Sequence, residues 1–252
     1  MSEKYLAGRV AVITGGSRGL GRAMALSLAK RGATIALVGR DRAKLDESQK
    51  LVAAEGVEVT TFTCDVREEA QVKKLADDVK AKYGKVHILI NNAGTAIRKN
   101  LVDFSFDEWK LVIDTNLHGV FLCTKYLLPL MKGHGYGRII NIGSIMGHVG
   151  STGRSAYCAT KAGVLSLTKT LGLELAKDDI TVVAISPGFY ATDLTAPLRA
   201  DQAKSDALLA QTPQQRWGQP PEIGELAAYI CSPSTGFMTG TDILMDGGWV
   251  AQ

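Results

Sequence analysis

The feature that most constrains the fold is a regular alternation of short β-branched runs with longer segments of helical periodicity. In the longer segments apolar residues recur three and four positions apart, as at Val164, Leu167 and Leu171. Strands that alternate with helices form a parallel sheet with helices on both faces. We therefore predict an α/β fold with a doubly wound seven-stranded parallel sheet. Its strands are expected at Val10–Thr14, Thr34–Val38, Val57–Thr63, Val86–Asn91, Arg138–Ile142, Thr181–Ser186 and Ile243–Asp246.

One domain accounts for all 252 residues, because the sequence contains no linker, internal repeat or low-complexity tract. The stretch 189–219 breaks the alternation, since it is polar and carries Pro197 and Pro213. A long excursion within a compact α/β domain is usually functional, so we expect a substrate loop here. A helical insertion that only packs on a neighbouring surface is the alternative.

Composition excludes several classes of function. The net charge is only +4 and the two signs are interspersed, so a nucleic-acid partner is not expected. No apolar run approaches the roughly 18 residues needed to span a bilayer, and the first residues do not read as a signal peptide. The four cysteines show no metal-ligand spacing. We expect a cytoplasmic protein that acts on a small molecule, without a metal or a membrane partner.

A glycine-rich turn, Thr14-Gly15-Gly16-Ser17-Arg18-Gly19-Leu20-Gly21, directly follows the first predicted strand and opens a helix. Glycines at such a junction let backbone N–H groups approach a pyrophosphate, which the helix N-terminus also attracts. A turn without a ligand is the alternative, since the spacing differs from G-x-G-x-x-G. We assign residues about 8–145 to a nucleotide-binding half and about 146–252 to a catalytic and substrate half.

The tip of the second predicted strand indicates which nucleotide is bound. A carboxylate there suits the ribose 2′-hydroxyl of NAD, whereas a guanidinium suits the 2′-phosphate of NADP. The expected acidic position holds Gly39, the next residue is Arg40, and Arg18 lies in the glycine-rich turn. We therefore predict NADP(H) in preference to NAD(H).

Two further strand ends carry candidate cofactor contacts. Asp65 and Val66 follow the third strand, and Asp65 can accept a hydrogen bond from an adenine amino group. Asn92, Ala93 and Gly94 follow the fourth strand. They supply backbone contacts to the cofactor, or they only tie this strand to its neighbours.

The reactive residues follow the fifth strand. Tyr157 and Lys161 stand four residues apart, which places both on one face of a helix. A nearby ammonium stabilises a phenolate and lowers its pKa. Ser144 ends the fifth strand, where its hydroxyl can bind a substrate oxygen. Asn116 lies within a helix, and its amide can hold a water that relays protons to Lys161.

Together these motifs resemble the short-chain dehydrogenase/reductase family over essentially the whole chain. The matches are 14–21, 65–66, 91–94, Asn116, Ser144, Tyr157, Lys161, Pro187-Gly188 and 246–248.

The resemblance implies a Rossmann fold, a nicotinamide cofactor and a catalytic tetrad. It implies that Tyr157 exchanges a proton with the substrate oxygen and that Ser144 orients the carbonyl. Lys161 would bind the nicotinamide ribose and lower the Tyr157 pKa, and Asn116 would anchor the relay water. Pro187 and Gly188 would flank the nicotinamide, and Thr192 would bind its carboxamide. It further implies a homotetramer formed through helices around 106–132 and 154–178.

The substrate is less well defined. Segments 196–201, 212–218 and 245–249 are similar to the gluconate 5-dehydrogenase and 2-deoxygluconate dehydrogenase branch. Arg98, Lys99 and Arg154 lie close in sequence to the reactive motifs, and a basic side chain there can bind a substrate carboxylate. The alternative is that Arg98 and Lys99 are loop charges exposed to solvent that bind no substrate. We expect a sugar acid such as gluconate or 5-ketogluconate, with a 3-oxoacyl-carrier-protein reductase, a broad-specificity ketone reductase and a non-catalytic NADP-binding sensor as alternatives.

Overall fold

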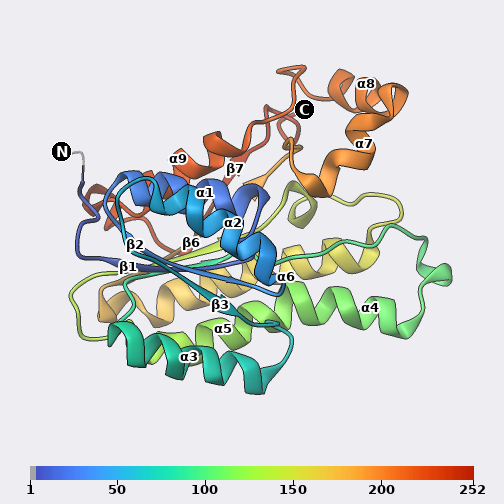
Figure 1. The fold of residues 1–252 in the computed structure, drawn as a ribbon. Coiled ribbons are helices and arrows are strands. Elements are labelled where there is room, and N and C mark those ends of the chain that lie inside the picture. Colours follow the sequence, from blue (N-terminus) through green and yellow to red (C-terminus); the bar gives the residue numbers. More distant parts are fainter. Residues whose placement is uncertain (1–3) are drawn as a thin grey trace.

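Seven parallel strands form one sheet of order β3-β2-β1-β4-β5-β6-β7 in the computed structural model, which describes residues 4–252 (Figure 1). Every residue of the four central strands is buried, as expected for parallel strands that are covered on both faces. The predicted seven-stranded parallel sheet is confirmed. The strands are β1 (Val10–Thr14), β2 (Thr34–Gly39), β3 (Val59–Thr63), β4 (Ile88–Asn91), β5 (Gly137–Ile142), β6 (Ile180–Pro187) and β7 (Thr241–Met245).

Helices cover both faces of the sheet and complete a single doubly wound domain of the Rossmann type (Figure 1). One apolar core lies between the sheet and α1, α2 and α9, and a second lies between the opposite face and α3, α5 and α6. The α-helices of residues 4–252 are α1 (Gly19–Lys30), α2 (Arg42–Ala53), α3 (Glu69–Tyr83), α4 (Phe106–Ile113), α5 (Gly119–Leu127), α6 (Ser155–Glu174), α7 (Ala196–Ala200), α8 (Gln202–Ala210) and α9 (Pro220–Ile230). None of them combines the length and the apolar character needed to span a bilayer.

Local capping explains where several helices begin. Ser105 and Glu108 form a reciprocal capping box at the start of α4. The side chain of Asp41 accepts a hydrogen bond from the Lys44 N–H and starts α2. Pro220 occupies the first position of α9, where its missing N–H has no cost. These residues fix the helix starts through contacts close in sequence.

The segment around 106–132 is a broken helix. A π-helical turn, η2 (Asp114–His118), separates α4 from α5 and contains Asn116. Such wider turns often occur at functional sites. At its end Gly119 packs against Val66, where a Cβ atom would lie only 2.8 Å from the valine side chain.

The strand order reverses at β1, which pairs with β2 on one side and β4 on the other. Ligands of open α/β sheets bind in the crevice beside the carboxyl ends of the strands at such a point. The segment 189–219, with α7 and α8, projects at this end of the sheet, at the upper right of Figure 1.

Candidate active site

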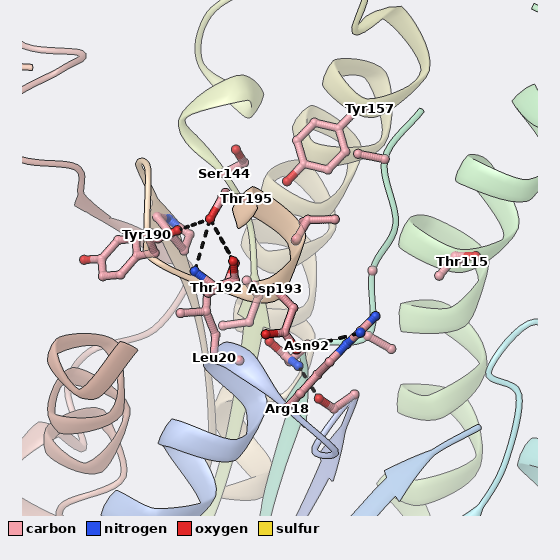
Figure 2. A pocket seen from close by; sticks show the side chains of 18 of the residues that line it. Arg18, Leu20, Asn92, Thr115, Ser144, Tyr157, Tyr190, Thr192, Asp193 and Thr195 are labelled. Atoms are coloured by element: carbon pink, nitrogen blue, oxygen red, sulfur yellow. Dashed lines mark hydrogen bonds and ion pairs between the residues drawn. The ribbon is translucent and has the colours of Figure 1, made fainter. Parts of the chain in front are cut away.

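A cavity of about 730 Å³ opens at the carboxyl ends of the strands (Figure 2). Its volume falls in the usual range for cofactor and substrate sites. It brings together nearly all of the residues that the sequence singled out. Those lining it are Gly15, Ser17, Arg18, Gly19, Leu20, Arg40, Asp65, Val66, Asn92, Ala93, Gly94, Arg98, Ser144, Arg154, Tyr157, Lys161, Pro187, Gly188 and Thr192. Gly21 and Asn116 lie outside this lining and support it from behind.

Gly15, Gly16 and Gly21 of the glycine-rich turn leave no room for a side chain. A Cβ atom on Gly21 would lie 2.2 Å from the Gly15 carbonyl oxygen. Gly15 itself has a φ of +62° and approaches Asn92, whose Nδ2 donates to the carbonyl oxygens of Thr14 and Gly15. Asn92 therefore ties the end of β4 to the turn after β1. The backbone of this turn is open to the cavity, which fits the close approach of a pyrophosphate.

The N-terminus of α1 supports the same ligand. Arg18 precedes the helix without a side-chain cap, and the first turn contains no acidic residue. The first N–H groups of the helix are therefore available to an anion, and the helix dipole favours one there. Arg18 Nη1 lies 3.7 Å from Asp193 Oδ2 of the segment 189–219 (Figure 2).

Asp65, which follows β3 and lines the cavity, has a basic partner that sequence reasoning missed. Arg67 binds its carboxylate through Nε at 2.9 Å and Nη2 at 2.5 Å. The hydrogen bonds from Arg67 hold the pKa of Asp65 below its usual value. Arg40 Nη1 lies 3.8 Å from the same carboxylate, and the Arg40 side chain is 63% exposed. Two guanidinium groups thus accompany the one carboxylate at this end.

Tyr157 and Ser144 lie at the other end of the cavity, close to one another in Figure 2. Ser144 is buried, and its Oγ accepts a hydrogen bond from the Met146 N–H at 3.1 Å, which starts the short helix η4 (Ile145–Gly147). Burial raises the pKa of Tyr157 above its usual value, and the Ser144 hydroxyl and the Arg154 charge lower it in part. The phenol is therefore a proton donor at neutral pH.

Lys161 is buried one helical turn beyond Tyr157. Its Nζ donates to the Ile142 carbonyl oxygen at 2.7 Å and lies 5.6 Å from the centre of the Tyr157 ring. Burial lowers the pKa of Lys161 to about 8. The Ser144 hydroxyl and the Arg154 charge are the groups that lower the Tyr157 pKa in this arrangement, and the expected contribution of Lys161 stays a prediction.

The buried ammonium of Lys161 predicts a stability that depends on pH. Its pKa is about 8 in the folded protein and 10.5 in the unfolded chain, so the unfolded state binds more protons between these values. The free energy of unfolding of the wild type should therefore rise with pH across this window, relative to Lys161→Met. Urea unfolding of both proteins at several pH values measures the difference. A difference that stays constant or falls contradicts the prediction.

Both amide atoms of Asn116 form hydrogen bonds to protein groups. Its Oδ1 accepts from the Thr95 N–H at 2.8 Å, and its Nδ2 donates to the Thr95 carbonyl oxygen and to Thr160 Oγ1. Asn116 is only 1% exposed. Its side chain therefore joins the loop after β4 to α6, and it has no free N–H for a relay water. Sequence reasoning missed Thr95 and Thr160, because they are 21 and 44 residues away.

Two arginines line the cavity next to the reactive residues. The Arg154 guanidinium lies 5.8 Å from the Tyr157 ring centre, and its Nε is buried without a hydrogen-bond partner. Burial, aided by the charge of Arg98, lowers the pKa of Arg154. Lys99 is different, because its Nζ forms an ion pair with Glu108 at 2.5 Å. Within the described residues, neither Arg98 nor Arg154 has a carboxylate partner.

The segment 189–219 forms one wall of the cavity. Thr195 Oγ1 donates to the carbonyl oxygen of Tyr190, and the Thr192 N–H donates back to Thr195 (Figure 2). This turn holds Thr192 beside the glycine-rich turn, where a Cβ atom on Gly19 would lie 3.6 Å from it. The other residues of this expected substrate loop that line the cavity are Phe189, Tyr190, Asp193, Leu194, Thr195, Pro197, Leu198 and Lys204.

Comparison with known proteins defines the family. A family model described as enoyl-(acyl carrier protein) reductase matches residues 15–250. The chain belongs to the short-chain dehydrogenase/reductase family and is an oxidoreductase that acts on CH–OH or carbonyl groups. The resemblance noted in the sequence is thereby confirmed.

Individual relatives point to more than one substrate. The 3-oxoacyl-[acyl-carrier-protein] reductase FabG of Staphylococcus epidermidis is 39% identical over 239 residues, which are 94% of this chain and 97% of the relative. A solved structure from Agrobacterium tumefaciens, described as a candidate gluconate dehydrogenase, has a TM-score of 0.95 and 32% identity over 99% of both chains. A second, described as a candidate 2-deoxy-D-gluconate 3-dehydrogenase with bound NADP, has a TM-score of 0.92 and 34% identity over 100% of both chains.

Proposed function

We propose that this protein transfers a hydride between NADP(H) and a sugar acid such as gluconate or 5-ketogluconate. The observation that carries the proposal is the Arg154 guanidinium, which lines the cavity 5.8 Å from the Tyr157 ring centre and has no carboxylate partner among the described residues. Burying a charge without a partner is costly. A substrate carboxylate would supply that partner and place the reacting carbon near Tyr157. Arg98, which also lines the cavity, is the second basic contact.

The tetrad residues divide the work as follows in this proposal. Bound NADP(H) supplies or accepts the hydride. Tyr157, whose raised pKa keeps it protonated, exchanges the proton with the substrate oxygen, and Ser144 orients the carbonyl. Lys161 binds the nicotinamide ribose. Both N–H groups of the Asn116 amide are used within the protein, so this side chain fixes the loop after β4 against α6, and only its Oδ1 could accept a further bond from a relay water.

The remaining cofactor contacts follow the cavity wall. We assign the diphosphate to the glycine-rich turn, the adenosine to Arg40, Asp65 and Val66, and the nicotinamide to Pro187, Gly188 and Thr192. Asn92, Ala93 and Gly94 would contact the ribose side. The preference for NADP(H) rests on Gly39 and Arg40 at the end of β2, and a structural neighbour with bound NADP supports it.

A 3-oxoacyl-carrier-protein reductase is the second candidate. The relative from Staphylococcus epidermidis supports it, and the same tetrad would serve a 3-oxoacyl thioester. A broad-specificity ketone reductase would likewise use the same groups. Neither a thioester group nor a neutral ketone provides a carboxylate for the Arg154 guanidinium, which lines the cavity. A non-catalytic NADP-binding sensor is disfavoured, because it has no use for Tyr157 and Lys161 in the cavity.

Removal of Arg154 tests the substrate class. We expect Arg154→Ala to raise KM for 5-ketogluconate by about 10–100-fold, because one hydrogen bond to a charged group is worth about 1.5–3 kcal/mol. Arg98→Ala should act in the same direction. The loss on a neutral ketone should be clearly smaller in both variants, since such a substrate never uses this contact and Arg154 affects its reduction only through the Tyr157 pKa. The measurement is kcat/KM for both substrates.

Lys99→Ala is the matched control. It removes a positive charge next to Arg98, but Lys99 pairs with Glu108 and does not line the cavity. Its kcat/KM for the sugar acid should stay near the wild-type value. Equal losses on both substrates in Arg154→Ala would mean that the arginine is structural. No activity with any sugar acid would favour the acyl or broad-ketone reductase.

We further propose a cytoplasmic homotetramer that assembles through the helices around 106–132 and 154–178. These helices carry large apolar side chains that the single chain leaves in solvent: Phe106 is 77% exposed, Phe121 50% and Leu173 81%. Exposed apolar side chains of this size are common at subunit interfaces.

A further inference from the structure

We infer that Asp242 is a positioning residue for catalysis and that it acts through the turn that carries Ser144. The inference rests on the role proposed above for Ser144. Asp242 lies on β7 and bridges two other elements. Its Oδ2 is 2.6 Å from His148 Nε2, and its Oδ1 accepts a hydrogen bond from Ser186 Oγ at 2.8 Å.

The two partners of Asp242 lie next to the two elements that frame the reactive end of the cavity. His148 directly follows η4, the short helix that Ser144 starts. Ser186 directly precedes Pro187 and Gly188, the residues proposed to flank the nicotinamide. One carboxylate therefore connects the Ser144 turn with the end of β6.

Packing makes this connection tight. Gly143 precedes Ser144, and a Cβ atom built on it would lie 2.6 Å from Ser186 Oγ. The Ser186 hydroxyl thus lies directly against the backbone that carries Ser144. Ser186 is fully buried and the Asp242 side chain is 11% exposed, so removal of the carboxylate would leave a buried hydroxyl without its acceptor.

Asp242, His148 and Ser186 do not line the cavity. An effect of Asp242 on the reaction must therefore pass through the groups that it holds. Small displacements of a reacting group can cost about 10²-fold in rate. We expect Asp242→Ala to lower kcat by about 10–100-fold, with the Kd for NADPH and the substrate KM changed by no more than about three-fold. Thr241→Ala, a change at an exposed neighbour on β7, should leave all three constants near their wild-type values.

A double-mutant cycle between Asp242 and Ser144 tests the inference. The kcat per NADPH-binding site, titrated by NADPH fluorescence, is measured for wild type, Asp242→Ala, Ser144→Ala and the double variant. If Asp242 acts through Ser144, Asp242→Ala should cost less than about three-fold once the Ser144 hydroxyl is gone. Equal costs in both backgrounds, or an unchanged kcat in Asp242→Ala, would overturn the inference.

Two further variants keep the test decisive if Asp242→Ala does not fold. Asp242→Asn retains an acceptor for Ser186, and His148→Gln retains a donor to Asp242. Asp242→Asn should lower kcat, and His148→Gln should keep at least about half of the wild-type kcat. Full activity in Asp242→Asn would overturn the inference. An unchanged kcat in Ser144→Ala would instead contradict the proposed role of Ser144, which distinguishes failure of the function from failure of the inference.

Discussion

Replacement of Tyr157 by Phe is expected to abolish almost all turnover while the cofactor still binds. The ring remains in place beside Ser144 and Arg154, and only the hydroxyl that exchanges the proton is lost. Loss of a general acid or base typically costs about 10²–10⁴-fold in rate. The raised pKa of Tyr157 means that the wild-type phenol carries the proton needed for carbonyl reduction at neutral pH. The measurement is kcat at saturating NADPH, together with the Kd for NADPH.

Tyr190→Phe is the control for this experiment. Tyr190 also lines the cavity, but its hydroxyl donates to the Met245 carbonyl oxygen at 3.1 Å and is committed to the fold. We expect this variant to keep most of its turnover. A Tyr157→Phe protein with more than a tenth of wild-type turnover would remove Tyr157 from its proposed role.

Replacement of both Arg18 and Arg40 by Ala should erase most of the preference for NADPH over NADH. Hydrogen bonds to charged groups contribute about 1.5–3 kcal/mol each, and solvent screening reduces this at Arg40, whose side chain is 63% exposed. We expect the ratio of kcat/KM for the two cofactors to fall by about 10–100-fold, mostly through KM for NADPH. Arg18→Ala also releases Asp193, so the single variants should be measured as well.

Arg42→Ala provides the matched control for charge. Arg42 lies on α2 two residues after Arg40, but it pairs with Asp46 and does not line the cavity. Its cofactor preference should equal that of the wild type. A wild-type enzyme that uses NADH as well as NADPH would refute the interpretation of the β2 end.

The sheet could be predicted from sequence because its signal is local. Each central strand is a short, mainly apolar run that is buried on both faces. The first and last residues of a strand are less well defined by the local sequence. The third strand begins at Val59 instead of Val57, because pairing with β2 starts where Ile35 meets Val59.

Much of the site could be predicted for a different reason. Residues at the carboxyl ends of parallel strands converge, so the turn after β1 and the ends of β3, β4, β5 and β6 had to share one cavity. The partners of those residues were harder to predict. Arg67 lies only two residues from Asp65, so that pair was open to sequence reasoning, whereas nothing local links Asn116 to Thr95 and Thr160. The π-helical turn around Asn116 ends at Gly119, which packs against Val66, a residue distant in the sequence.

The central claim is tested most directly by the change in nicotinamide absorbance when NADPH is mixed with 5-ketogluconate, a 3-oxoacyl thioester and a neutral ketone in turn, with NADH in parallel. The account predicts that 5-ketogluconate oxidises NADPH with the highest kcat/KM of the three carbonyl compounds. The kcat/KM for the same sugar acid should be lower when NADH replaces NADPH. A higher kcat/KM for the thioester would contradict the substrate assignment. Absence of NADPH and NADH oxidation with every carbonyl compound would contradict the catalytic role of the whole site.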